Sequence, residues 1–212
     1  MNKINYQKEL DRIIAEQESC GLVPSLLLHV CCAPCSSYCL EYLSRYFDIT
    51  VYYYNPNISI KEEYECRLSE EIRYISEKEF LHPVSITESV YDPQEFFTAV
   101  KGLEGEPEGG LRCRECFKLR LGASAKKARE LGFDYFTTTL TISPLKNASL
   151  LNEIGAQMGQ KYGVNWLPSD FKKKEGYKRS IELSREYDLY RQNYCGCIFS
   201  KNKGEDLGAA AP

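Results

Sequence analysis

Short apolar runs alternate with longer amphipathic segments along most of this chain of 212 residues. The short runs are rich in leucine, β-branched and aromatic residues, as strands are, whereas the longer segments repeat apolar residues every three to four positions, as helices do. We predict strands at residues 25–30, 48–54, 82–86, 135–140 and 166–167. We predict helices at residues 4–17, 36–46, 62–78, 92–100, 113–131, 143–161 and 177–187.

Strands that alternate with helices of this length predict an α/β fold, a parallel sheet with helices on both faces. The length suits one domain, which we assign to residues 1–200. Residues 201–212 are polar and end in alanine and glycine, so we expect a disordered tail there. Within the long charged helix, we expect the core stripe to consist of Tyr64, Leu68, Ile72 and Ile75.

Candidate chemistry begins directly after the first strand, where Cys31, Cys32 and Cys35 occupy three of five positions. Pro34 prevents the strand from continuing in a ladder, and Ser36 is a suitable N-cap for the next helix. Ligands of open α/β sheets bind outside the carboxyl ends of strands, and a helix N-terminus lowers thiol pKa values. We therefore expect a metal site at the carboxyl ends of the strands.

Two further thiol groups follow, Cys113-x-x-Cys116 at a helix start and Cys195-Gly-Cys197 late in the chain. Cys113 and Cys116, with two thiols from the Cys31–Cys32 turn, would form a four-thiolate set that suits zinc or an iron–sulfur cluster. The glycine between Cys195 and Cys197 would let the backbone kink to close a strained, redox-active disulfide. Binding of a second metal by this pair is an equally good interpretation.

The overall composition narrows the class of protein further. The chain has no apolar run as long as a membrane span, and its polar start is not a secretory signal, so we expect a cytoplasmic protein. Disulfides rarely persist in that compartment, and ten cysteines therefore indicate metal or redox chemistry. The net charge of −3 means that any nucleic-acid site must be a local patch.

One such patch is the basic segment from residue 171 to 203, in which tyrosines are interleaved with lysines and arginines. That pattern suits single-stranded RNA, because cations meet phosphates and bases stack on rings. Lys172, Lys173 and Lys178 are the candidate substrate contacts, although a solvated helix face explains them equally well. Asp170 follows a strand at the expected active edge and is either a catalytic carboxylate or a helix N-cap.

Six motifs taken together resemble the epoxyqueuosine reductase QueH family. The resemblance runs from about Leu26 to Ser200 and departs from many members at Ser59-Ile60, where a proline is expected. The motifs are His29–Cys35 (HVCCAPC), Tyr54–Ile58 (YNPNI), Arg112–Cys116 (RCxxC), Thr137–Leu140 (TTTL), Asp170–Lys173 (DFKK) and Tyr190–Cys197 (YRQNYCGC).

The resemblance implies an oxidoreductase of queuosine biosynthesis that reduces the epoxide of epoxyqueuosine at the tRNA anticodon wobble position without cobalamin. It implies a Rossmann-like (HUP-type) fold, a [4Fe-4S] cluster and, in some members, an adjacent second metal ion. Carried onto this chain, the cluster ligands are Cys31, Cys32, Cys113 and Cys116. Cys195 and Cys197 would be the redox-active pair or, with Cys35, ligands of the second metal. The electron donor is unidentified.

Removal of the epoxide oxygen needs an electrophile, either a Lewis-acid metal or a general acid, for which Asp170 and Tyr194 are candidates. Two rival functions use some of the same residues. A zinc-stabilised RNA-binding module without catalysis would leave Cys195 and Cys197 idle. A nucleotide-activating tRNA thiolation enzyme would need a glycine- or serine-rich phosphate loop, which the turn after the first strand does not resemble.

Overall fold

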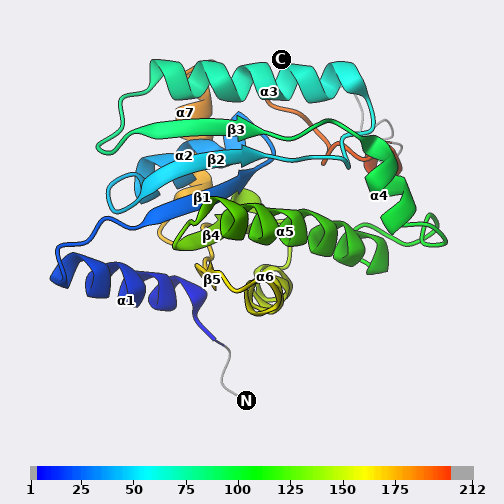
Figure 1. The fold of residues 1–212 in the computed structure, drawn as a ribbon. Helices are drawn as coiled ribbons and strands as arrows, with labels where there is room; N and C mark the ends of the chain where they lie inside the picture. Colours follow the sequence, from blue (N-terminus) through cyan, green and yellow to red (C-terminus); the bar gives the residue numbers. More distant parts are fainter. Residues whose placement is uncertain (1–3, 202–212) are drawn as a thin grey trace.

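A five-stranded, wholly parallel sheet forms the centre of the computed structural model, which describes residues 4–201. The strand order is β3-β2-β1-β4-β5 (Figure 1). The strands are β1 (Ser25–Val30), β2 (Asp48–Tyr53), β3 (Val84–Glu88), β4 (Tyr135–Thr138) and β5 (Asn165–Trp166). The predicted α/β class and parallel sheet are confirmed, whereas the HUP assignment stays a prediction.

Helices cover both faces of this sheet (Figure 1). They are α1 (Tyr6–Ser19), α2 (Ala33–Leu43), α3 (Lys61–Glu77), α4 (Pro93–Ala99), α5 (Leu111–Leu131), α6 (Ala148–Tyr162), α7 (Gly176–Glu186) and α8 (Ile198–Lys201), with the 3₁₀ turn η1 (Thr139–Ile142) after β4. Side chains of α1, α2 and α3 share one buried cluster with β1 and β2. Those of α5 pack against the opposite face.

The alternation of side chains along β1 explains these two layers. Leu26, Leu28 and Val30 belong to the cluster under α2, whereas Leu27 belongs to the cluster under α5. All four are fully buried, because a central parallel strand is covered on both faces.

The strand order also fixes the place where a ligand can bind. The chain runs outward from β1 to β3 and then returns to pair β4 with the other side of β1. Two neighbouring strands whose connections leave in opposite directions open a crevice at their carboxyl ends. Cys31 and Thr139 are the first residues after β1 and β4, so the crevice opens beside the first thiols.

Three local predictions are wrong, each for a physical reason. Helix α2 begins at Ala33 instead of Ser36, because the fixed φ of Pro34 suits a first helical turn and Cys32 takes the N-cap position. Residues 139–140, predicted as the end of a strand, instead begin η1, and α6 begins only at Ala148, after its N-cap Asn147.

The predicted stripe of α3 is displaced by about one residue. Tyr64 is buried as expected, but Ile72 is 41% exposed. The other buried residues of α3 are Arg67, Glu71 and Tyr74, which share a helical face with Tyr64. Leu68 and Ile75 are partly buried and pack against core clusters, so the prediction is wrong at Ile72, and periodicity alone missed the buried arginine and carboxylate.

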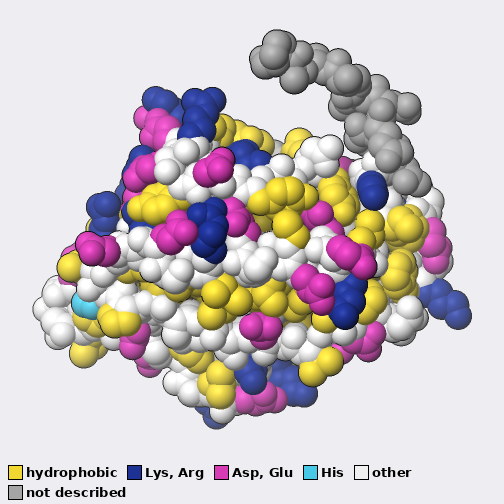
Figure 2. All heavy atoms as spheres, turned by 90° about the horizontal axis from the view of Figure 1, so that it is seen from above, with side chains coloured by type: hydrophobic (Ala, Val, Ile, Leu, Met, Phe, Trp, Pro, Cys, Tyr) yellow, Lys and Arg dark blue, Asp and Glu magenta, His cyan; other side chains and the backbone are white. Residues whose placement is uncertain are grey.

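The outer surface gives little sign of a single-sign patch over α3. Figure 2 shows that face with Lys and Arg side chains intermixed with Asp and Glu. Arg73, for example, pairs with Glu70 and Glu77 along α3. No helix among residues 4–201 has the length and apolar character needed to cross a membrane. The predicted tail lies outside the described residues, except Lys201, which ends α8.

Candidate active site

The strand-end thiols form the tightest group of potential metal ligands. The Sγ atoms of Cys31, Cys32 and Cys35 all lie within 4.8 Å of one another, and Cys31 and Cys32 are buried. Local structure fixes all three, because β1 ends at Val30, Cys32 is the N-cap of α2, and the amide of Cys35 donates to the Cys32 carbonyl at 3.1 Å.

The arrangement of these three cysteines favours ionisation of one thiol, whose negative charge is stabilised by the other two. Hydrogen bonds from the thiols of Cys32 and Cys35, with the charge of Arg120, hold the pKa of Cys31 well below its usual range. The Cys31 thiolate in turn raises the pKa of Cys32 and Cys35. Three clustered sulfurs at a helix N-terminus, two of them on buried residues, suit a soft metal or an iron–sulfur centre, so this donor set fits the expected cofactor.

The second thiol pair sits at the start of α5, as the C-x-x-C spacing predicts. Cys113 packs against the buried cluster that contains Cys31 and Cys32. Cys116 belongs to the neighbouring cluster, together with Cys197. Burial raises the pKa of both Cys113 and Cys116, the latter to about 11. Among the described residues, neither lies within the 4.8 Å group formed by the strand-end thiols.

The third pair lies on the loop between α7 and α8. The Sγ atoms of Cys195 and Cys197 are 3.6 Å apart, and all ten cysteines, which fall within residues 4–201, are free thiols. The expected disulfide is therefore not formed in this structure. Gly196 has a φ of +106°, a conformation that side-chain-bearing residues rarely adopt, and this lets the two sulfurs face each other. A hydrogen bond from Cys197 holds the pKa of Cys195 well below its usual range.

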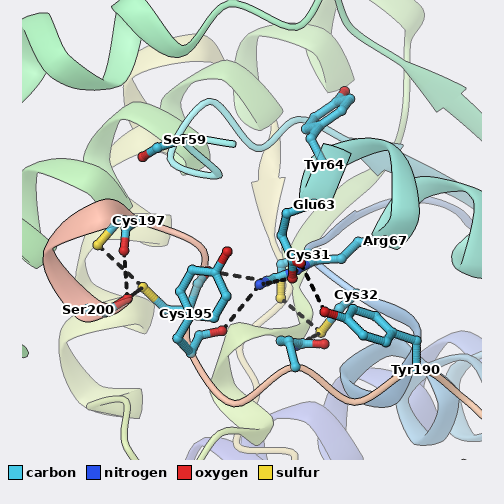
Figure 3. A network of polar contacts seen from close by, with 12 residues as sticks. Cys31, Cys32, Ser59, Glu63, Tyr64, Arg67, Tyr190, Cys195, Cys197 and Ser200 are labelled. Carbon is cyan, nitrogen blue, oxygen red and sulfur yellow. Dashed lines mark hydrogen bonds and ion pairs between the residues drawn. The ribbon is translucent and has the colours of Figure 1, made fainter. Parts of the chain in front are cut away.

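Arg67 of α3 holds the loop that carries this pair (Figure 3). It is 1% exposed and donates to the carbonyl oxygens of Tyr194 (3.3 Å) and Cys195 (3.4 Å). Its guanidinium lies 5.2 Å from the centre of the Tyr194 ring. Glu63 pairs with Arg67 at 2.6 Å and also accepts from the Tyr190 hydroxyl at 2.9 Å. Sequence patterning missed Arg67, because it treated the charged positions of α3 as solvated.

A second buried cation, Arg120 of α5, lies between the thiol groups. Its Nη2 donates to Asn55 at 2.7 Å, and its Nε donates to His29 Nε2 at 3.3 Å. His29 Nδ1 forms a hydrogen bond with the Thr138 hydroxyl at 2.8 Å, and its Nε2 also lies 3.2 Å from the Tyr54 carbonyl oxygen. Burial lowers the pKa of His29 to about 3, so the ring is neutral. The charge of Arg120 acts on Cys116 and Cys31.

Two cavities that share five lining residues lie beside these groups. The larger has a volume of about 380 Å³ and is lined by Cys31, Cys35 and Cys195, among others. The smaller has a volume of about 90 Å³ and is lined by all four cysteines of the α5 and C-terminal pairs. Cys195 lines both, so the three thiol groups converge on one region at the carboxyl ends of the strands.

Of the other predicted site residues, some line a cavity and others do not. Tyr194 lines the larger cavity, whereas Asp170 lines neither cavity and pairs with Lys172 at 3.2 Å. Lys172 also donates to the Thr141 carbonyl at 2.9 Å, so it serves the fold. Lys178 is exposed and 3.7 Å from Glu175, and Lys173 is exposed. Their contacts with a nucleic acid stay predictions.

Comparisons with known proteins agree with the resemblance in the motifs. The sequence model described as epoxyqueuosine reductase QueH matches residues 26–203. A Streptococcus pyogenes protein of that name is 49% identical over 208 residues, covering 97% of this chain and 82% of the relative. A Staphylococcus epidermidis relative is 48% identical (95% and 86% covered), and one from Thermotoga maritima is 37% identical (83% and 90% covered), both with the same name. The chain therefore belongs to the epoxyqueuosine reductase QueH family.

Proposed function

We propose that this protein reduces the epoxide of epoxyqueuosine in tRNA to the alkene of queuosine, with thiols and a thiolate-bound iron–sulfur centre as its redox groups. The observation that carries the proposal is the convergence of three thiol groups on two cavities that share lining residues, in a chain of this family. The reaction consumes two electrons and two protons, breaks both C–O bonds of the epoxide and releases the oxygen as water.

The proposed cluster ligands are Cys31, Cys32, Cys113 and Cys116. Their support is the strand-end group of sulfurs and the packing of Cys113 against it. When bound, a [4Fe-4S] cluster would supply electrons one at a time. Arg120 would offset the negative charge of the thiolates from the protein side, since it is a buried cation beside Cys31 and Cys116.

Cys195 and Cys197 are proposed as the two-electron partner. Oxidation of two thiols to a disulfide releases two electrons and two protons, which is the requirement of the reaction. The depressed pKa of Cys195 supports this role, because the thiolate is the reactive form. The alternative, a second metal held with Cys35, has less support, since Cys35 groups with Cys31 and Cys32.

The larger cavity is proposed to receive the modified nucleoside. Tyr177 and Tyr194 line its wall, and the buried Oε1 of Gln192 has no hydrogen-bond partner within residues 4–201. An unpaired buried acceptor is costly, so a hydroxyl or amine of the substrate would satisfy it. Lys173 and Lys178 are proposed phosphate contacts, to be tested by the salt dependence of tRNA binding in Glu variants.

The proposal is tested by anaerobic purification with iron, sulfide and zinc analysis, followed by turnover of epoxyqueuosine-containing tRNA. We expect Cys113→Ala and Cys116→Ala to lose iron, sulfide and activity, because three thiolates hold a cubane poorly. Cys66→Ala is the matched control, since Cys66 is exposed and outside the cavities. Full iron and sulfide in either cavity variant would contradict the assignment, and stoichiometric zinc without sulfide would favour the RNA-binding module.

A further inference from the structure

The turn between η1 and α6 places one lysine between the two cavities. Five residues line both of them, namely Glu108, Arg120, Leu145, Lys146 and Cys195. Glu108 is the only carboxylate on either wall among the described residues. The common region is therefore rich in cations and sulfur.

Lys146 differs from Arg67 and Arg120 because its side chain makes no hydrogen bond or ion pair with the described residues. Arg67 and Arg120 make hydrogen bonds to protein groups. The Lys146 ammonium makes no hydrogen bond or ion pair with any residue between 4 and 201, although the charges of Cys31, Cys195 and Cys35 act on it. A half-buried ammonium that faces a cavity without a protein partner is available to a ligand.

The backbone beneath that side chain is well anchored. The amide of Lys146 donates to the Ser143 carbonyl at 3.2 Å, and Asn147 caps α6 by accepting from the Leu150 amide at 3.1 Å. Lys172 donates to the Thr141 carbonyl at 2.9 Å, which ties the preceding η1 turn to the segment after β5. The turn thus presents the ammonium from a fixed position.

The two acids that the sequence singled out, Asp170 and Tyr194, do not line the shared region. Asp170 lines neither cavity, and Tyr194 lines only the larger one. We propose that Lys146 is a catalytic residue whose ammonium hydrogen-bonds to the epoxide oxygen and gives it a proton as the C–O bond breaks. This inference rests on the proposed reduction of an epoxide in the larger cavity.

The proton balance is simple. The oxygen released from the epoxide takes two protons and leaves as water, while the two electrons come from the redox groups of the reaction. Lys146 supplies one of the protons and regains it from solvent. Stabilising the developing negative charge on oxygen with a fixed cation lowers the barrier, since an alkoxide is a poor leaving group.

The test compares Lys146→Met with Lys126→Met, a control on an exposed turn of α5. We expect Lys146→Met to lower kcat by about 10²- to 10⁴-fold, the usual contribution of a general acid. Iron, sulfide and the Kd for epoxyqueuosine-containing tRNA should match those of the wild type, and Lys126→Met should turn over normally. A loss of iron, a loss confined to tRNA affinity, or a rate within threefold of the wild type would overturn the proposal.

Two more variants separate proton donation from charge. Ethylammonium added to Lys146→Ala should restore turnover in proportion to its concentration, which a purely structural lysine would not permit. Lys146→Arg should stay slow, because a guanidinium scarcely releases its proton. Full activity of Lys146→Arg, or no response to ethylammonium, would overturn the assignment. An inactive wild-type enzyme with full iron would instead contradict the proposed function.

Discussion

Two thiol-bearing turns of this protein are held in place by different means. Cys31, Cys32 and Cys35 lie where a fully paired central strand meets a helix, so the backbone framework fixes them. Cys195 and Cys197 lie on an irregular loop that is held by the side chains of Arg67 and Asn57, which both donate to the Cys195 carbonyl, and by one backbone hydrogen bond, from the Ser59 amide to the Gly196 carbonyl. A backbone-held site tolerates loss of a neighbouring side chain, whereas a side-chain-held site depends on each of its few contacts.

The largest effects should come from the thiols themselves. We expect Cys31→Ala to lose iron and all turnover, because it removes the sulfur whose pKa is lowered within the 4.8 Å group. Cys195→Ser should keep the iron yet turn over slowly or not at all. Metal analysis alongside single-turnover assays checks both. Iron loss from Cys195→Ser would show that the two turns share one centre.

Removing the Arg67 guanidinium should loosen only the loop that carries Cys195 and Cys197. We expect Arg67→Met to lower kcat by up to about 10²-fold, since small displacements of reacting groups are that costly. Amide hydrogen exchange should speed up at residues 190–197 while β1 stays protected. Lys61→Met, an exposed change on the same helix, is the control. Unchanged exchange in the loop would mean that other contacts suffice to hold it.

Substitution by alanine should cost more stability at Gly196, in the C-terminal thiol loop, than at Pro34, in the turn after β1. A Cβ on Gly196 would lie 2.8 Å from Ile58 Cγ1, in a conformation with φ of +106°. We expect Gly196→Ala to cost about 1–3 kcal/mol of unfolding free energy, or to displace the loop and slow turnover. Pro34→Ala should cost under about 1 kcal/mol, because any residue adopts a first helical turn. Denaturant titration of both variants measures the difference.

A substitution at Glu41 should change stability and leave both thiol-bearing turns intact. Glu41 of α2 accepts from Nε and Nη2 of Arg179, each at 2.9 Å, and these bonds, with Lys78, lower its pKa. A carboxylate with a depressed pKa stabilises the fold above its unfolded pKa, about 4.3, and loses that contribution as pH falls through the folded value. We expect Glu41→Gln to be less stable by about 1–2 kcal/mol at pH 7, and this difference should shrink as the pH falls below the unfolded pKa. Thermal unfolding of both proteins between pH 7 and pH 3 measures this stability difference. A difference that persists in acid would mean that the variant loses packing and not an ion pair.

The local sequence pattern determined much of the fold and the placement of the first two thiol groups. The apolar run of residues 25–30 could only be a buried strand, and the thiols after it had to lie at the sheet's carboxyl edge. The C-x-x-C pair was correctly placed at a helix start, since α5 begins at Leu111. The tertiary structure decided which residues share that edge. Arg67, Arg120 and Lys146 come from three separate elements, and in the sequence they look like ordinary surface cations. Arg67 and Arg120 were missed because burial of a charge depends on partners distant in the chain, as Arg67 meets Cys195 across 128 positions.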